Sequence, residues 1–140
     1  MRASLSAAAV VLLLLGPLLG SSAKAEQLDR GRDDYMRYCS ACHGEDADGN
    51  GPVSDALTPR PPALTDLRTK YGNPLSTRLV EFISGTTLPR AHGTSEMPVW
   101  GKVLREQTGD ESQASEILWR IVRYLDRIQV QDGERVGTEP

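Results

Sequence analysis

The chain has 140 residues, with 16 basic and 19 acidic side chains and a net charge of −3 at pH 7. This length corresponds to one small domain, and the negative balance argues against nucleic acid or an anionic membrane as a partner. The aromatic residues are one Phe, two Trp and four Tyr, so the protein can build only a limited apolar core from its own side chains.

The first 25 residues have the composition of a secretory signal peptide. Arg2 gives a short basic start, an apolar run covers residues 7–15, and residues 23–25 (Ala-Lys-Ala) have the small-residue pattern of a cleavage site. The alternative is a membrane anchor, but the apolar run is short for a helix that spans a bilayer. We expect a signal peptide at residues 1–25, export of the chain, and no stable membrane span after cleavage.

Residues 26–130 form the predicted folded domain. Its first predicted helix covers residues 28–38, with Asp29 as the N-cap. Gly31 inside this helix costs about 1 kcal/mol relative to Ala, which indicates that another backbone or ring approaches it closely. A loop rich in glycine and proline is predicted at residues 44–62.

The second half of the domain is predicted to be helical, over residues 64–71, 73–85, 98–107 and 110–128. Asn73 and Pro74 are expected to be the N-cap and first residue of their helix, and Gly85 is expected to end it. The last helix begins with a capping box at Asp110. Its apolar side chains repeat at helical spacing: Ala114, Ile117, Leu118, Ile121, Leu125 and Ile128. The polar tail at residues 131–140 is expected to be disordered.

Cys39, Cys42 and His43 form the motif C-x-x-C-H, which is the sequence at which haem c is attached. Each thiol can form a thioether with a haem vinyl group, and the neighbouring imidazole can then bind the iron. These two cysteines are the only ones in the chain, so haem attachment would leave no thiol free.

Other uses of the two cysteines are open at this point. A disulfide between Cys39 and Cys42 would close a very short loop and would add little stability. A structural zinc site needs four ligands, and only four Cys and His candidates exist besides acidic residues: Cys39, Cys42, His43 and His92. A dithiol redox centre would also use a C-x-x-C pair.

Taken in order along the chain, these features resemble a class I c-type cytochrome, a small monohaem electron carrier. That family has an N-terminal helix leading into C-x-x-C-H, a loop over the haem, a methionine in a later loop and a C-terminal helix, and residues 26–130 have the same order. Gly31 and Tyr35 match the family's glycine and aromatic residue before the motif, and Tyr124 with Leu125 matches its aromatic-Leu pair. The resemblance implies that the two terminal helices cross at Gly31, beside Tyr124.

The resemblance also implies two axial ligands from different segments. His43 would be the proximal ligand, with its second ring nitrogen donating to a proline carbonyl in the following loop. The candidates for that carbonyl are Pro59, Pro61 and Pro62. Met97, in a Met-Pro-x-Trp segment, would be the distal ligand through its thioether sulfur. His92 is the alternative distal ligand, and it would give a lower reduction potential.

We therefore expect an all-α, cytochrome c-like bundle of about four or five short helices wrapped around one covalently attached haem. The implied function is periplasmic electron transfer, with Fe(III)/Fe(II) cycling between an upstream dehydrogenase or cytochrome complex and a downstream oxidase or reductase. The same residues would serve a haem c subunit of a larger periplasmic or membrane-associated dehydrogenase or oxidase complex. A small haem enzyme such as a peroxidase is a further interpretation, but it needs an open distal site, which Met97 argues against.

Overall fold

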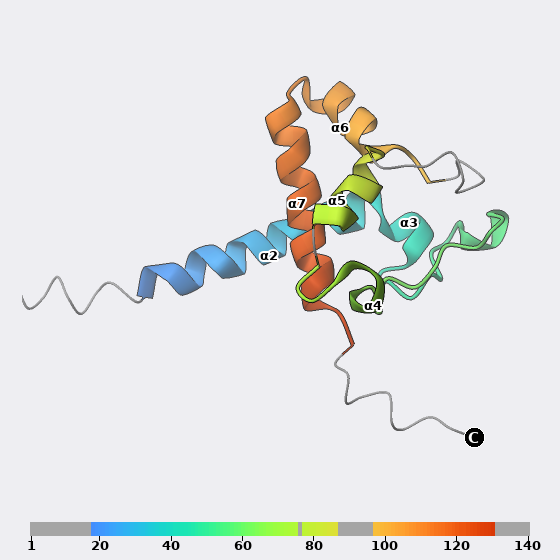
Figure 1. Ribbon diagram of the computed structural model, residues 1–140, viewed down its shortest axis with the longest axis horizontal. Helices are drawn as coiled ribbons and strands as arrows, with labels where there is room; N and C mark the ends of the chain where they lie inside the picture. Colours follow the sequence, from blue (N-terminus) through green and yellow to red (C-terminus); the bar gives the residue numbers. More distant parts are fainter. Residues whose placement is uncertain (1–17, 76, 87–96, 131–140) are drawn as a thin grey trace, which may run out of the picture.

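The computed structural model describes residues 18–75, 77–86 and 97–130 (Figure 1). Within these ranges the chain forms helices and loops with no β-strand, so the expected all-α class is confirmed. The elements are α2 (Leu18–Tyr38), α3 (Ser40–His43), the 3-10 helix η1 (Ser54–Ala56), α4 (Arg68–Tyr71), α5 (Thr77–Ser84), α6 (Trp100–Thr108) and α7 (Glu111–Arg127). None of the described helices is long and apolar enough to cross a membrane. The predicted tail and most of the predicted signal peptide lie outside the described residues.

The first described helix is longer than the sequence pattern predicted. α2 begins at Leu18, so Asp29 lies inside the helix and is not its N-cap. Residues 18–28 are rich in Ala, Leu, Lys, Glu and Gln, which are good helix formers, and they contain no proline, so nothing ends the helix before Asp29. α2 therefore runs through the expected cleavage site at residues 23–25, and its first turns project away from the other helices (Figure 1).

α2 and α7 cross at Gly31, as the resemblance implied (Figure 1). A Cβ on Gly31 would lie 2.5 Å from the backbone oxygen of Arg120 and 3.1 Å from the Cβ of Tyr124, so only glycine allows this approach. One turn further along α2, the ring of Tyr35 packs against Tyr124 with the ring centroids 5.3 Å apart. Asp34 adds an ion pair between the helices, 2.7 Å from its Oδ2 to Nε of Arg120.

α7 supplies much of the core. Oδ1 of Asp110 accepts hydrogen bonds from the backbone N–H groups of Ser112 and Gln113, at 2.7 and 3.0 Å, which confirms Asp110 as the N-cap. The reciprocal half of the predicted capping box is wrong, because the N–H of Asp110 donates to Oγ1 of Thr108 at 3.2 Å. The buried stripe agrees with the predicted one except that Val122 is also buried and Ile128 is half buried. Its buried members are Ala114, Ile117, Leu118, Ile121, Val122 and Leu125. Helices α5 and α6 bring buried side chains of their own to the same cluster, namely Leu79, Ile83 and Leu104.

The short helix α4 begins later than the predicted start at residue 64. The backbone of the residues before it is engaged elsewhere: Leu64 N–H donates to Ala47 O, and Val130 N–H donates to Thr65 O. The N–H of Leu67 donates to the side chain of Gln129. Because these partners lie outside the helix, residues 64–67 form an irregular connection, and the helical turn starts only at Arg68.

Helix α5 also begins later than predicted, although it ends where expected. Asn73 and Pro74 lie in a turn before the helix, so they are not its N-cap and first residue. The N–H of Leu75 donates to Oδ1 of Asp126 at 3.0 Å, which holds this turn against the end of α7. Gly85 follows the last residue of α5 with a φ of 81°, as a glycine that ends a helix does. Helix α6 lies close to its predicted range.

Candidate functional site

The C-x-x-C-H motif lies where α2 ends and α3 begins. Cys39 stands between the two helices and is buried, while Cys42 in α3 is half buried. The N–H of Cys39 donates to the carbonyl of Tyr35, and the carbonyl of Cys39 accepts from the N–H of His43. The motif therefore continues the helical path of α2, with both cysteines as free thiols.

The environment of Cys39 favours an uncharged sulfur. Burial raises the pKa of this thiol to about 12, with smaller contributions from Cys42 and Asp34. A dithiol redox centre needs a cysteine whose pKa is lowered, because the thiolate is the attacking form. Cys39 thus lacks the environment of a redox-active nucleophile, whereas a thioether, which carries no charge, suits a buried position.

His43 is held by one specific hydrogen bond. Its Nδ1 lies 3.0 Å from the carbonyl oxygen of Pro62. Because a carbonyl oxygen can only accept, Nδ1 must carry the proton, and the neutral ring then has its lone pair on Nε2. Burial lowers the pKa of His43, against an opposing effect of the Pro62 hydrogen bond, and so favours the neutral ring. Of the three candidate prolines, the structure selects Pro62 over Pro59 and Pro61.

The loop after the motif folds back to bring Pro62 to the imidazole. The N–H of Gly49 donates to the carbonyl of His43 at 2.8 Å. Gly49 has a φ of 86°, and a Cβ there would lie 2.6 Å from the carbonyl oxygen of Pro61 and 3.2 Å from the carbonyl carbon of Pro62. The two segments of the loop, around residue 49 and at residues 61–63, can therefore approach each other only because residue 49 is glycine. The N–H of Leu64 donates to Ala47 O at 2.7 Å and closes the loop just after Pro62.

The tip of this loop is built from polar turns. Oδ1 of Asp48 accepts from the N–H of Asn50 at 2.9 Å, and Oδ2 accepts from the Asn50 side chain at 2.7 Å. These hydrogen bonds lower the pKa of Asp48. Arg60 reaches across to Asp55 at 2.8 Å and to Oγ of Ser54 at 3.2 Å. Among the described residues, no group of three or more His, Cys, Asp or Glu side chains is placed to hold a metal ion.

Met97 lies just before α6, and 39% of its surface is exposed. Val99, at the start of α6, is 40% exposed, and Val53, in the loop after the motif, is 43% exposed. These three are the large apolar side chains that the described part of the chain leaves exposed. They lie in the loop after the motif and in the segment before α6, the two segments that the resemblance implied would flank a haem.

The segment that carries Met97 is anchored to the motif end of α2. Trp100 packs edge-on against Tyr38, with ring centroids 5.4 Å apart. Tyr38 directly precedes Cys39, so the aromatic contact ties the segment that leads from Met97 into α6 to the cysteine motif. His92, the alternative distal ligand, lies outside the described residues.

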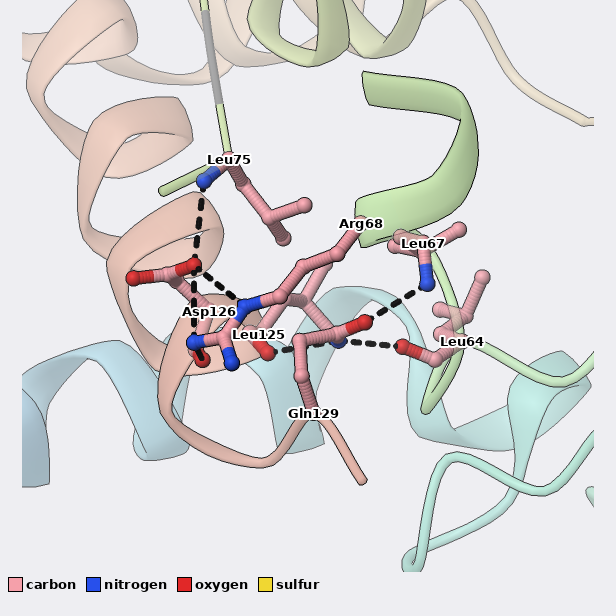
Figure 2. A network of polar contacts seen from close by, with 7 residues as sticks. All are labelled: Leu64, Leu67, Arg68, Leu75, Leu125, Asp126 and Gln129. Atoms are coloured by element: carbon pink, nitrogen blue, oxygen red, sulfur yellow. Dashed lines mark hydrogen bonds and ion pairs between the residues drawn. The ribbon is translucent and has the colours of Figure 1, made fainter. Parts of the chain in front are cut away.

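The polar residues at the end of α7 were not recognised in the sequence. Gln129 is buried, with 4% of its surface exposed, and Asp126 binds the backbone of Leu75 and the side chain of Arg68 (Figure 2). The available signal was spacing: Gln129 follows the apolar residue Leu125 by four positions, so it continues the buried face of the helix. A polar residue in that register needs buried partners.

Comparisons with protein-family models, with curated proteins and with solved structures gave no match for this chain.

Proposed function

We propose that this protein is a periplasmic electron carrier with one haem c, attached covalently through Cys39 and Cys42. His43 and Met97 would be the axial ligands of its iron. The observation that carries the proposal is the 3.0 Å contact between Nδ1 of His43 and the carbonyl of Pro62. It assigns the tautomer whose Nε2 has a lone pair for a metal, and His43 directly follows two free cysteines in a C-x-x-C-H motif.

The donor set fits the proposed cofactor. A neutral imidazole and a thioether are the axial pair that favours Fe(II) and raises the potential of a c-type haem. Val53, Met97 and Val99 are each exposed, so the loop after the motif and the segment before α6 both offer apolar side chains that would lie against an apolar macrocycle. When bound, the haem supplies a one-electron Fe(III)/Fe(II) couple.

The protein's own contribution is orientation and a dry environment. The Pro62 carbonyl holds the His43 ring in one orientation and raises its basicity through Nδ1–H. The buried position of Cys39 excludes water from one attachment point. With both axial positions filled, no substrate would bind the metal, and the chain would act as a carrier and not as an enzyme.

Fold and location follow the same proposal. The crossing of α2 and α7 at Gly31, beside Tyr124, supports a cytochrome c-like bundle around the motif. The composition of residues 1–25 supports export to the periplasm. Partners would be an upstream dehydrogenase or cytochrome complex and a downstream oxidase or reductase, which would dock on small surfaces because turnover needs rapid release.

The test is an optical spectrum of the exported protein from a host that attaches haem c, recorded oxidised and after reduction with dithionite. A sharp reduced α band that persists after acid–acetone extraction supports covalent haem, and the variant with Cys39→Ser and Cys42→Ser is the matched control that should lose it. Absence of a Soret band from the unmodified protein overturns the proposal. Purification in a stable complex with a dehydrogenase or oxidase would instead assign the chain as a haem subunit.

A further inference from the structure

The side chain of Gln129 joins the end of α7 to the segment that follows Pro62 (Figure 2). Its Nε2 donates to the carbonyl of Leu64 at 2.7 Å and to the carbonyl of Leu125 at 2.8 Å. Its Oε1 accepts from the N–H of Leu67 at 2.6 Å. The amide therefore uses both donor hydrogens and its acceptor on backbone groups, while only 4% of the residue is exposed.

These bonds continue directly to His43. Leu64, whose carbonyl receives the Gln129 amide, has its N–H bonded to Ala47 O in the loop after the motif. Pro62 lies two residues before Leu64, and its carbonyl accepts from Nδ1–H of His43. The segment that orients the imidazole thus lies against Gly49 at residues 61–63 and is bonded to Gln129 at Leu64.

We propose that Gln129 is a positioning residue for His43: it fixes the backbone at Leu64, which fixes the Pro62 carbonyl on Nδ1–H. Any consequence for an iron atom rests on the proposed function, whereas the coupling between Gln129 and the His43 ring does not. Without the Gln129 hydrogen bonds, the hydrogen bond between the Pro62 carbonyl and Nδ1–H of His43 would be formed for a smaller fraction of the time. The ring would then be a less basic ligand, which would raise the reduction potential of a bound iron.

The chain provides a control next to this contact. Arg68 donates from Nη2 to the backbone oxygen of Asp126 at 2.8 Å, and its guanidinium also pairs with the Asp126 carboxylate at 3.3 Å. This pair ties α4 to the end of α7, as Gln129 ties the preceding segment (Figure 2). Arg68 is six residues after Pro62 in the chain, whereas Leu64 is two residues after it. Arg68→Met should therefore weaken the packing against α7 without loosening the Pro62 carbonyl.

The experiment measures solvent exchange of the His43 Nδ1–H by ¹⁵N-edited NMR in the purified full-length protein, kept reduced. Gln129→Met has nearly the same length and removes all three hydrogen bonds, and we expect exchange about tenfold faster than in the unmodified protein. Arg68→Met should change the exchange rate less than about twofold. If Gln129→Met does not fold, Gln129→Glu is measured instead, because it keeps the acceptor for Leu67 and loses donation to Leu64.

Equal exchange in the Gln129 variant and the unmodified protein would overturn the inference, and so would equal acceleration by Arg68→Met. In protein that carries haem, the midpoint potential is a second readout, which should rise in Gln129→Met and stay unchanged in Arg68→Met. Protein without haem would refute the proposed function, but exchange of the His43 ring proton would still decide the role of Gln129. The two failures are therefore distinguishable.

Discussion

Gly31 in α2 faces the backbone carbonyl of Arg120 in α7 so closely that a Cβ on Gly31 would lie 2.5 Å from the Arg120 oxygen. The neighbouring contact, 3.1 Å to the Cβ of Tyr124, is also tighter than ordinary packing. Neither the Arg120 oxygen nor the Tyr124 Cβ is the end of a flexible side chain. The steric clash with an added Cβ could therefore be removed only if the two helices moved apart. This contact sets how near α2 can lie to α7, and α2 leads directly into the cysteine motif.

Gly31→Ala should lower the free energy of unfolding by about 2 kcal/mol, because overpacking at the crossing outweighs the better helix propensity of Ala. Urea denaturation followed by circular dichroism measures the change. Arg32→Ala, at the next and exposed position of the same helix, is the control and should stay within about 0.5 kcal/mol of the unmodified protein. A Gly31→Ala protein as stable as the original would show that the helices are not in contact here.

The ion pair between Asp34 and Arg120 should contribute to stability more than the exposed pairs do. Its side chains are only 15% and 17% exposed, and the two atoms lie 2.7 Å apart. A double-mutant cycle with Asp34→Asn and Arg120→Gln should give a coupling energy of about 1–2 kcal/mol, between the values typical of surface and buried pairs. The same cycle on Arg105 and Glu111, whose side chains are largely exposed, should give less than about 0.5 kcal/mol. Equal couplings in the two cycles would contradict this reading.

Features that depend on neighbouring residues could be predicted from the sequence. Asp110 caps α7 through N–H groups two and three residues away, and the apolar repeat of α7 needs only helical spacing. The start of α2 was predicted wrongly because Asp29 is a good N-cap residue by type, yet the helix formers at residues 23–28 precede it and the helix continues back to Leu18. The crossing at Gly31 was predicted from the family resemblance, and the cost of glycine in a helix was only a hint of it.

Features that depend on the path of the chain could not be predicted. Pro59, Pro61 and Pro62 are nearly equivalent in sequence, and the choice of Pro62 follows from how the loop closes on Gly49. Gln129 is hydrogen-bonded to Leu67, which lies 62 positions earlier in the chain, and to Leu64, which lies 65 positions earlier. No local pattern indicates such partners. The spacing of Gln129 from the buried residues of α7 indicates burial, but the identity of the buried partners is a property of the fold.

In protein made without haem, Cys39 should make stability fall at alkaline pH. Burial raises the pKa of this thiol from 9.0 to about 12, so the folded state holds the proton more tightly than the unfolded state does. The contribution of the protonated Cys39 thiol to the free energy of unfolding is complete below pH 9.0. It is lost as the pH rises toward about 12, at no more than about 1.4 kcal/mol per pH unit. Urea midpoints at about pH 8 and about pH 10 measure this loss.

Cys42→Ser keeps the Cys39 thiol and should keep the alkaline loss, whereas Cys39→Ser should reduce it. Protein with haem attached through a thioether at Cys39 has no proton to lose there, so the same contribution should be absent from it. An identical loss in Cys39→Ser would mean that another group, such as the buried Tyr35 hydroxyl, whose pKa is also raised, is responsible.

Tyr35→Phe should lower the free energy of unfolding by about 1–2 kcal/mol. The Tyr35 hydroxyl is fully buried and donates to the carbonyl of Gly44 at 2.6 Å, so its removal leaves a buried acceptor without this partner. Tyr38→Phe is the matched control, because Tyr38 is half buried and its ring packs on Trp100 without loss of that contact in Phe. It should change stability by less than about 0.5 kcal/mol. A similar loss in the two variants would indicate that the Gly44 contact contributes nothing of its own.

Met97→Ala should remove the distal ligand of the proposed haem and leave covalent attachment intact. The weak far-red charge-transfer band of the oxidised protein should disappear, and the reduced protein should gain binding of carbon monoxide, because the variant offers no thioether at that position. The midpoint potential should fall, since the thioether favours Fe(II). Optical titration with carbon monoxide and a redox titration measure both effects.

Met36→Ala is the control for this variant, because Met36 is a half-buried methionine of α2 that packs against the core one turn before Cys39. It should keep the far-red band, although it also removes a methionine side chain. If the unmodified protein lacks the far-red band and Met97→Ala does not gain binding of carbon monoxide, Met97 is not the ligand. His92→Ala then becomes the decisive variant: loss of low-spin character there would assign two histidine ligands, which would give a lower potential and a different place for this carrier among its redox partners.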